Sequence, residues 1–179
     1  MVRMTALVDP DTSRWQSWAA MVEDFGGTPE MHGSGHWFLE GDPVPTEAGC
    51  AAFVAMTELT APGDLDGTRV PSSYFWITEG DGCPDDEVVG FLNLRHVLNA
   101  FLLEEGGHIG YSIRPSARRQ GHASAALGLA VVAAAGLGID RVLVTCEDDN
   151  DASRRTIEAN GGVLEDVRNG KRRYWITTG

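Results

Sequence analysis

The sequence predicts a mixed α/β fold of the α+β kind, in which a central mixed β-sheet is flanked by helices. Residues 73–78 and 88–95 are β-rich runs joined by a turn-forming segment, which indicates an antiparallel hairpin. Residues 108–146 then carry the pattern of a strand, a long apolar helix and another strand. Two short strands, 163–168 and 171–177, follow near the end of the chain. This order differs from the regular strand–helix alternation of a repeated βαβ winding.

The N-terminal part of the chain is predicted to hold two helices separated by a long loop. Residues 14–22 carry apolar side chains at helical spacing, and Asp-Thr-Ser at 11–13 supplies a cap. Residues 26–46 are rich in glycine and proline, so we expect a loop there. A second short helix is expected over 47–59. This part of the sequence carries no informative motif.

The elements after the hairpin are more clearly bounded. A strand over 108–114 stops before a proline, and the following helix, about 121–137, is apolar on nearly every face and should be largely buried. The strand over 141–146 is a nearly continuous β-branched run, which is typical of a strand covered on both faces. A short helix over 151–160 ends at two glycines.

Length and charge limit the classes of function. The chain has 179 residues, of which 42% are apolar, as expected for one compact domain. Its net charge of −12 is uneven: residues 1–110 carry 4 bases and 18 acids, whereas residues 111–179 carry 10 bases and 8 acids. Nucleic acid is therefore not an expected partner, because phosphate neutralisation needs a dominant basic surface. A smaller anion remains compatible with the second part.

Cysteine usage and hydropathy favour a cytoplasmic location. Cys50, Cys83 and Cys146 form no C-x-x-C pair, so neither a disulfide scaffold nor a structural zinc site is predicted. No apolar run has the length of a signal peptide or of a membrane span, so we expect no membrane partner. Cys146 lies in an apolar strand and is expected to be a core residue, not an acyl carrier.

Two local patterns resemble metal sites but are incomplete. His32 and His36 have i,i+4 spacing, yet the glycines between them argue against a helix that presents both. Residues 147–151 are acidic but lack the downstream glycine and glutamate of a calcium loop. Their carboxylates are better explained as favourable charges at a helix N-terminus. No metal is predicted.

The segment whose residues point most clearly to ligand binding joins a predicted strand to the long helix. Arg114, Arg118 and Arg119 lie in this turn. The first N–H groups of a helix carry partial positive charge, and Gly121 and Ala123 would leave them uncovered. A group of uncovered backbone N–H donors beside two arginines is suited to bind a pyrophosphate. A helix start with a solvated basic turn is the alternative, and neither the P-loop nor the dinucleotide fingerprint fits.

Residues 118–123, Arg-Arg-Gln-Gly-His-Ala, resemble the R/Q-x-x-G-x-G/A signature of the GNAT superfamily of N-acetyltransferases, which binds the pyrophosphate of acetyl-CoA. An apolar-x-Pro strand end, beginning at Ile113, precedes the signature as it does in that superfamily. Downstream, Asn150 with Ser153 and Gly161 matches the superfamily's second segment, in which an Asn opens the next helix and a Gly closes it.

The resemblance covers about residues 70–179. It therefore implies a single GNAT-type domain over 1–179, with 1–69 as a variable, acceptor-side part. The segments 94–99 and 106–111 further resemble a bacterial subgroup known mostly as predicted acetyltransferases. That subgroup does not supply a substrate.

The resemblance implies acetyl-CoA as cosubstrate. It places the Ile113 backbone N–H against the thioester carbonyl, where it would stabilise the oxyanion, and the Asn150 side chain against the thiol arm. A helix N-cap is the alternative role for Asn150. Superfamily members splay the strands that here hold Ile113 and Cys146, and pantetheine fills the gap. The implied cofactor-binding residues are Ile113, Arg114, Arg118, Arg119, Gln120, Gly121, His122, Ala123, Ser124, Asn150 and Ser153.

Direct transfer to an amine calls for a base, because an alkylamine with a pKa near 10.4 is mostly protonated at neutral pH. Glu104, Glu105 and His108 precede the turn. We expect His108 to be the base, since the pKa of a free imidazole is near 6.5, and Glu105 is a second candidate. An ordinary polar strand residue is the alternative role for His108.

The general acid departs from the superfamily pattern. Many members carry a Tyr seven residues after the Asn, where this chain has Ile157. Tyr111 or Tyr174 could donate the proton instead, or no strong acid is used, because a CoA thiol with a pKa of about 8.5 is already a tolerable leaving group.

The leading hypothesis is therefore an acetyl-CoA-dependent N-acetyltransferase acting on the primary amine of a small molecule or peptide. The acidic part, 1–110, would attract a cationic acceptor. Two alternatives stay open: a catalytically weak CoA-binding sensor or structural module, and an acyltransferase for a longer acyl-CoA. The resemblance is also compatible with a homodimer.

Overall fold

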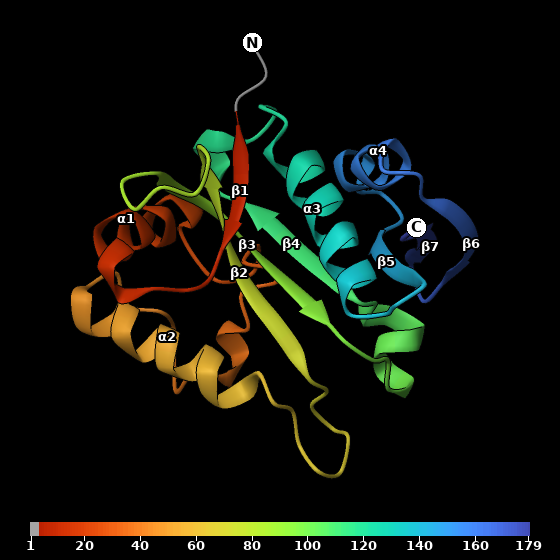
Figure 1. The fold of residues 1–179 in the computed structure, drawn as a ribbon, viewed down its shortest axis with the longest axis horizontal. Coiled ribbons are helices and arrows are strands. Elements are labelled where there is room, and N and C mark those ends of the chain that lie inside the picture. The colour runs from red at the N-terminus through yellow and green to blue at the C-terminus, as the bar shows by residue number, and fades with distance from the viewer. Residues whose placement is uncertain (1–3) are drawn as a thin grey trace.

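A computed structural model describes residues 4–179, which form helices and strands in the mixed α/β arrangement expected (Figure 1). The helices are α1 (Trp15–Phe25), α2 (Glu47–Thr60), α3 (His122–Gly136) and α4 (Asp151–Ala159), with the short turns η1 (Thr12–Arg14), η2 (His36–Phe38), η3 (Leu102–Gly106) and η4 (Pro115–Ala117). The strands are β1 (Thr5–Val8), β2 (Ser72–Glu79), β3 (Glu87–Arg95), β4 (Ile109–Ile113), β5 (Arg141–Glu147), β6 (Val163–Arg168) and β7 (Lys171–Thr177).

The strands form two sheets, ordered β1-β2-β3-β4 and β5-β7-β6. Every paired strand in both is antiparallel, and the predicted hairpin is β2 with β3. The expected strand–helix–strand unit is β4, α3 and β5, and it passes from one sheet to the other. The mixed α/β class is thus confirmed, with a gap between β4 and β5 where the two sheets meet.

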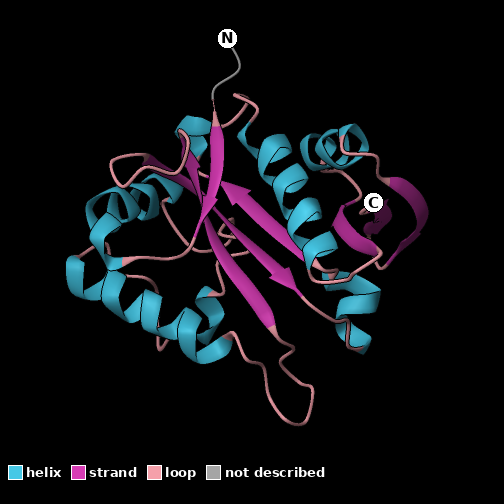
Figure 2. Cartoon of the chain, viewed as in Figure 1, coloured by secondary structure: helices cyan, strands magenta, loops and turns pink. Residues whose placement is uncertain are grey.

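Two hydrophobic cores lie on opposite faces of the first sheet. Helices α1 and α2 cover one face, while α3 covers the other (Figure 2). The alternation along β3 divides its side chains accordingly, because Leu92 and Leu94 pack in the α3 core and Phe91 packs in the α1–α2 core. Leu127 and Ala130 of α3 are fully buried, but Leu129 and Val132 are 41% and 68% exposed. The expectation that α3 is largely buried is therefore wrong for its outer face, because the helix covers the sheet with one side only.

Two elements were not predicted from the sequence. Strand β1 has four residues and pairs only with β2, so it is too short to show a period. The π-helical turn η3 depends on contacts made by distant residues: Arg95 donates to the carbonyl oxygens of Gly106 and Gly107, and Thr145 Oγ1 donates to that of Glu105.

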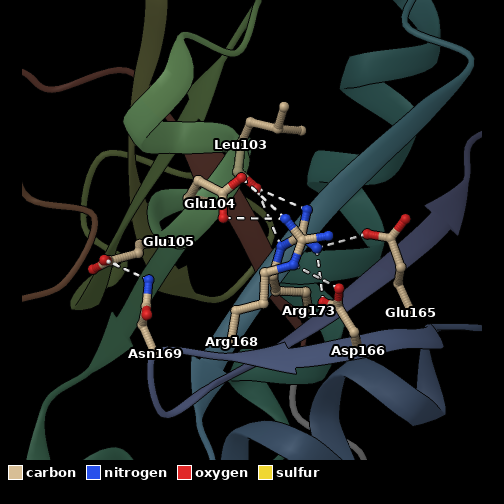
Figure 3. A network of polar contacts seen from close by, with 8 residues as sticks. All are labelled: Leu103, Glu104, Glu105, Glu165, Asp166, Arg168, Asn169 and Arg173. Atoms are coloured by element: carbon tan, nitrogen blue, oxygen red, sulfur yellow. Dashed lines mark hydrogen bonds and ion pairs between the residues drawn. The ribbon is translucent and has the colours of Figure 1, made fainter.

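Polar contacts also hold the β6–β7 hairpin against η3 (Figure 3). The buried Arg173 guanidinium donates to the Leu103 carbonyl oxygen at 2.9 Å and pairs with Glu165 and Asp166. Arg168 forms a second, exposed pair with Glu104. These contacts join the second sheet to the connection between β3 and β4. No helix within residues 4–179 is long and apolar enough to cross a membrane.

Candidate active site and cofactor cleft

The gap between β4 and β5 leaves one edge of β4 without a strand partner. Arg95 N–H donates to the His108 carbonyl oxygen and Arg114 N–H donates to that of Val89, so within the strand Gly110 and Ser112 direct their backbone groups to β3. Ile109, Tyr111 and Ile113 therefore direct their backbone groups to the opposite edge. The Ile113 carbonyl on that edge accepts from Arg118 Nε at 2.9 Å, and its N–H faces the gap.

At its other end the gap is closed by His108. The His108 N–H donates to the Leu143 carbonyl oxygen at 2.7 Å, and the Leu143 N–H donates to His108 Nδ1 at 2.8 Å. The imidazole is buried and lies near Trp175. Burial, and then the Arg95 guanidinium, lower the pKa of His108 to about 4. The ring is therefore neutral at pH 7, with Nδ1 already occupied as an acceptor.

A cavity of about 650 Å³ opens at the Ile113 end of the gap. Its lining comes from the α1–α2 loop, from the end of β4, from the turn into α3 and from the start of α4. The lining residues are Glu30, His32, Tyr111, Ser112, Ile113, Ala117, Arg118, Arg119, Gly121, His122, Ala123, Ser124, Asn150, Ala152, Ser153 and Thr156.

The N-terminus of α3 forms one wall of this cavity. Gly121 precedes the helix with φ +93°, a left-handed conformation that favours glycine, and no side chain among residues 4–179 caps the helix. In this part of the chain, the N–H groups of His122, Ala123 and Ser124 consequently have no intrahelical acceptor and no capping group. Uncovered donors of this kind, together with the helix dipole, are suited to an anion.

The arginines of the turn divide into two groups. Arg118 and Arg119 line the cavity, and Arg118 also pairs with Glu30 across it. Arg114 does not line the cavity: it is buried and pairs with Glu87 and lies 3.7 Å from Asp24 on the side of α1. The position of Arg114 thus favours a structural role.

The side chains of two further residues of the signature make contacts within the protein. Gln120 donates to the Ser116 carbonyl oxygen at 3.2 Å and is not part of the cavity lining. The His122 ring is buried, with Nδ1 2.9 Å from Thr5 Oγ1 and Nε2 3.3 Å from a Glu79 carboxylate oxygen. The His122 side chain therefore fixes the start of α3 against β1 and β2, while the residue also lies in the cavity wall.

The start of α4 forms the opposite wall. Asn150 Oδ1 accepts from the Ser153 N–H at 3.0 Å, so Asn150 is the N-cap of α4. Its Nδ2 group makes no hydrogen bond within residues 4–179 and remains available to a ligand. Ser153 Oγ lies 2.9 Å from the Tyr111 hydroxyl, and burial raises the pKa of Tyr111 to about 12.

The sequence as a whole matches a known domain over most of this structure. The acetyltransferase (GNAT) domain family covers residues 6–163, which includes both walls of the cavity and much of the N-terminal part. The chain belongs to the GNAT acetyltransferase family. The resemblance noted at residues 118–123 is thereby confirmed. No curated protein sequence matches the chain.

Solved GNAT structures share the fold at low identity. RimJ from Mycobacterium smegmatis, in complex with a CoA-disulfide, is 19% identical over 98% of this chain and 83% of its own, with a TM-score of 0.68. RimL, a ribosomal L7/L12 α-N-protein acetyltransferase bound to coenzyme A, is 20% identical over 97% and 93%, with a TM-score of 0.64. The ribosomal-protein-S5-alanine acetyltransferase of Vibrio fischeri is 14% identical over 99% and 94%, with a TM-score of 0.63.

The cavity brings together most of the residues expected to bind the cofactor but few of those expected to be catalytic. Tyr111 lines the cavity, whereas His108, Glu105 and Tyr174 do not. The Glu105 carboxylate accepts from Asn169 Nδ2 at 3.3 Å, next to the β6–β7 turn. Tyr174 is buried in the α3 core and donates to a Glu158 carboxylate oxygen at 3.0 Å.

Ile157 and Cys146 are both core residues of this GNAT domain. Ile157 has no exposed surface and packs in the α3 core, so the position of the family's usual acid holds only an apolar side chain. Cys146 lies in the same core, and burial raises the pKa of its thiol. Its expected role as a core residue is consistent with both observations.

Sequence reasoning missed the contribution of the α1–α2 loop and part of α4. Thr156 could have been found, because it follows Ser153 by three residues and so lies on the same face of the helix. Glu30 and His32 sit in an irregular loop without periodicity, and only their tertiary contacts bring them to the cavity. Among residues 4–179, no three His, Cys, Asp or Glu side chains gather as a potential metal group.

Proposed function

We propose that this protein transfers the acetyl group of acetyl-CoA directly to a primary amine. The observation that carries the proposal is that one cavity contains both an uncovered helix N-terminus with two arginines and the outward-facing N–H of Ile113. The first suits a pyrophosphate, and the second suits a thioester carbonyl. Family membership and the coenzyme A complexes of RimJ and RimL support the same conclusion.

The residues present fit acetyl-CoA. The N–H groups of residues 122–124 and the guanidinium groups of Arg118 and Arg119 would hold the pyrophosphate. The open edge of β4 offers the backbone groups of Tyr111 to the pantetheine amides, as an added strand would use them, while the Ile113 carbonyl oxygen already accepts from Arg118. Asn150 Nδ2 faces the same cavity and would donate to this arm.

The residues near the gap would promote transfer by stabilising charge. Ile113 N–H polarises the thioester carbonyl and donates to its oxygen as negative charge develops there. Tyr111 remains protonated at neutral pH, since its pKa is raised to about 12 by burial. Transfer of its proton to a thiolate, whose conjugate acid has a pKa near 8.5, is uphill, so Tyr111 acts as a hydrogen-bond donor to the departing sulfur.

The acceptor is proposed to be a cationic amine. Residues 1–110 supply the α1–α2 side of the cavity and carry 18 acids against 4 bases, which attracts positive charge. RimL is named as an acetyltransferase of a protein α-amine, and the microcin C7 immunity acetyltransferase MccE is named in complex with acetyl-CoA and AMP. Both a peptide N-terminus and a small-molecule amine therefore belong in a screen of acceptors.

Binding of acetyl-CoA is tested by thermal unfolding with a variant of the helix N-terminus. Ala123→Glu places a carboxylate in the anion site, and Ala135→Glu adds the same charge at an exposed position near the other end of α3. We expect acetyl-CoA to raise the Tm of the wild type and of Ala135→Glu but not that of Ala123→Glu. An equal shift in all three, or none, contradicts the proposed site.

Transfer itself is tested by release of free thiol from acetyl-CoA across polyamines, amino acids, aminoglycosides and peptides. Turnover with at least one amine supports the proposal. Binding without turnover would favour a CoA-binding module without catalysis, which the apolar Ile157 would explain. Faster turnover with propionyl-CoA or succinyl-CoA would identify a longer acyl donor.

A further inference from the structure

The α1–α2 loop is fixed on β4 immediately beside the residue that faces the gap. Ser112 Oγ donates to the His32 carbonyl oxygen at 2.7 Å. Gly33 has φ +77°, and a Cβ at this position would overlap the carbonyl group of Gly110. The close approach of Gly33 to Gly110 and the hydrogen bond from Ser112 together anchor the backbone of His32 next to Ile113.

His32 also lies on the correct face for an acceptor. Along β4, Ile109 and Ile113 pack in the α3 core, so Ser112 faces the opposite side of the sheet. The contact of Ser112 with His32 places the loop on that opposite face. The cavity lined by His32 reaches Ile113 as well, so an amine held there could approach the thioester from the side away from α3.

His32 differs from the other histidines in having a free imidazole. His36 Nδ1 lies 2.9 Å from Ser34 Oγ, and His96 Nε2 lies 2.9 Å from Ser73 Oγ. His108 and His122 are buried in the contacts described above. Within residues 4–179, the His32 ring makes no hydrogen bond, and the residue is exposed.

We propose that His32 is the general base for the acceptor amine. The inference rests on the proposed function and replaces His108, whose Nδ1 is occupied, in that role. His32 takes one proton from the ammonium group and passes it to solvent. The free amine forms the C–N bond as the C–S bond breaks, and the second proton leaves the nitrogen for the departing thiolate. The products are the acetamide, CoA thiol and one proton in solution.

The charged groups around His32 come from the cavity, from its own loop and from β3, whose Arg95 guanidinium lies beside Gly110 where Gly33 packs. Glu30 lies near it and pairs with Arg118, and electrostatic interaction with His32 is one of the causes that lower the pKa of Glu30. His36 on the same loop is the other ionisable neighbour. From the remaining walls, Arg119, Tyr111 and His122 line the cavity.

The first test compares His32→Gln with His36→Gln, which alters a histidine of the same loop that does not line the cavity. With the best amine of the screen, we expect His32→Gln to lower kcat/KM by about 10²-fold and to remove the fall in kcat/KM on the acidic side that an imidazole base produces. His36→Gln should retain that fall. The Tm shift given by acetyl-CoA should be unchanged in both variants.

The second test uses no turnover. The imidazole resonances of His32, assigned by their absence in His32→Gln, should shift when coenzyme A is added, while those of His96 should not. Two results overturn the role of His32 alone. One is turnover by the wild type together with an unaltered pH profile in His32→Gln. The other is a His32 resonance that does not move on saturation with coenzyme A. Absence of turnover with every amine overturns the proposed function itself.

Discussion

At the closed end of the gap between β4 and β5, His108 fastens the two strands, whereas at the open end Ile113 faces a cavity. The closed end satisfies its polar groups internally, through His108, Leu143 and the carbonyl groups of η3. At the open end, the Ile113 N–H, the first N–H groups of α3 and the Asn150 Nδ2 group have no hydrogen-bond acceptor within residues 4–179. Both ends are polar, but among these described groups the donors without an acceptor lie at the open end.

The two histidines at these ends differ in the same way: one is held by hydrogen bonds to the protein and the other has an exposed ring. His108 is buried and its pKa is lowered to about 4, so it remains neutral and accepts a backbone hydrogen bond. His32 is exposed and its ring makes no hydrogen bond within residues 4–179. A residue type alone therefore does not identify a catalytic base, because its role depends on which of its nitrogen atoms is free.

The largest expected effect is a loss of stability on removing the polar contacts that hold η3 at the closed end. Arg173→Met removes a guanidinium whose side chain is 2% exposed and leaves the Glu165 and Asp166 carboxylates and the Leu103 carbonyl without it. We expect the free energy of unfolding to fall by about 3 kcal/mol, measured by urea denaturation. Arg168→Met, on the same hairpin but 45% exposed, should lower the free energy of unfolding much less, because solvent screens its ion pair. Equal losses would show that η3 does not depend on Arg173.

The second prediction concerns the pH dependence of stability at the closed end. Because the pKa of His108 is about 4 when folded and near 6.5 in an unfolded chain, the unfolded state binds more protons between these values. The contribution of His108 is therefore complete above about pH 6.5 and is lost as the pH falls toward 4, by up to about 3 kcal/mol. Urea denaturation of His108→Gln should show a shallower fall between pH 6.5 and 4.5 than the wild type. An equal fall in the free energy of unfolding for both proteins would contradict the conclusion that His108 is neutral in the folded state.

A smaller effect is expected from Glu30 at the open end. Its carboxylate pairs with Arg118, and this contact lowers the pKa of Glu30. A phosphate would compete with Glu30 for the same guanidinium. Glu30→Gln should therefore tighten the Kd for coenzyme A by up to about fivefold in calorimetric titration, since an exposed ion pair is a weak competitor. Weaker binding would show that Glu30 supports the ligand.

The smallest expected effect is the response of turnover to salt. The acidic part, 1–110, attracts a cationic acceptor through solvent, and such attraction is screened over about 8 Å at physiological ionic strength. We expect kcat/KM for a cationic amine to fall about twofold between roughly 0.02 and 0.15 M salt, while that for a neutral amine is unchanged. Efficient, salt-independent turnover of an anionic acceptor would remove the functional meaning of the uneven charge.

Much of the fold and of the open end could be predicted because it is encoded locally. The apolar helix before residue 137, the hairpin strands and the signature at 118–123 each depend on neighbouring residues, and the structure brings most of that signature to one cavity. The closed end depends on residues far apart in the chain. His108 could not be separated from a base without knowing that Leu143, thirty-five positions away, donates to it.

Contacts between distant segments also explain the remaining differences. Arg114 looked equivalent to Arg118 in the sequence, but its pairs with Glu87 and Asp24 turn it toward α1. His32 and His36 were compared as a metal pair, and only the packing of Gly33 on Gly110 shows that His32 lies at the cavity. Local patterns thus predicted the turn into α3, and tertiary contacts were needed to place the side chains beside it.

The most direct test of the two-ended gap follows backbone amides by ¹H–¹⁵N NMR in the protein with coenzyme A and then with acetyl-CoA. The two ligands differ only in the acetyl group, so the Ile113 amide should shift between them if its N–H donates to the thioester carbonyl. The Leu143 amide, which is bound to His108, should not move. An Ile113 amide that is the same with both ligands, or a Leu143 amide that moves as far, would contradict the account.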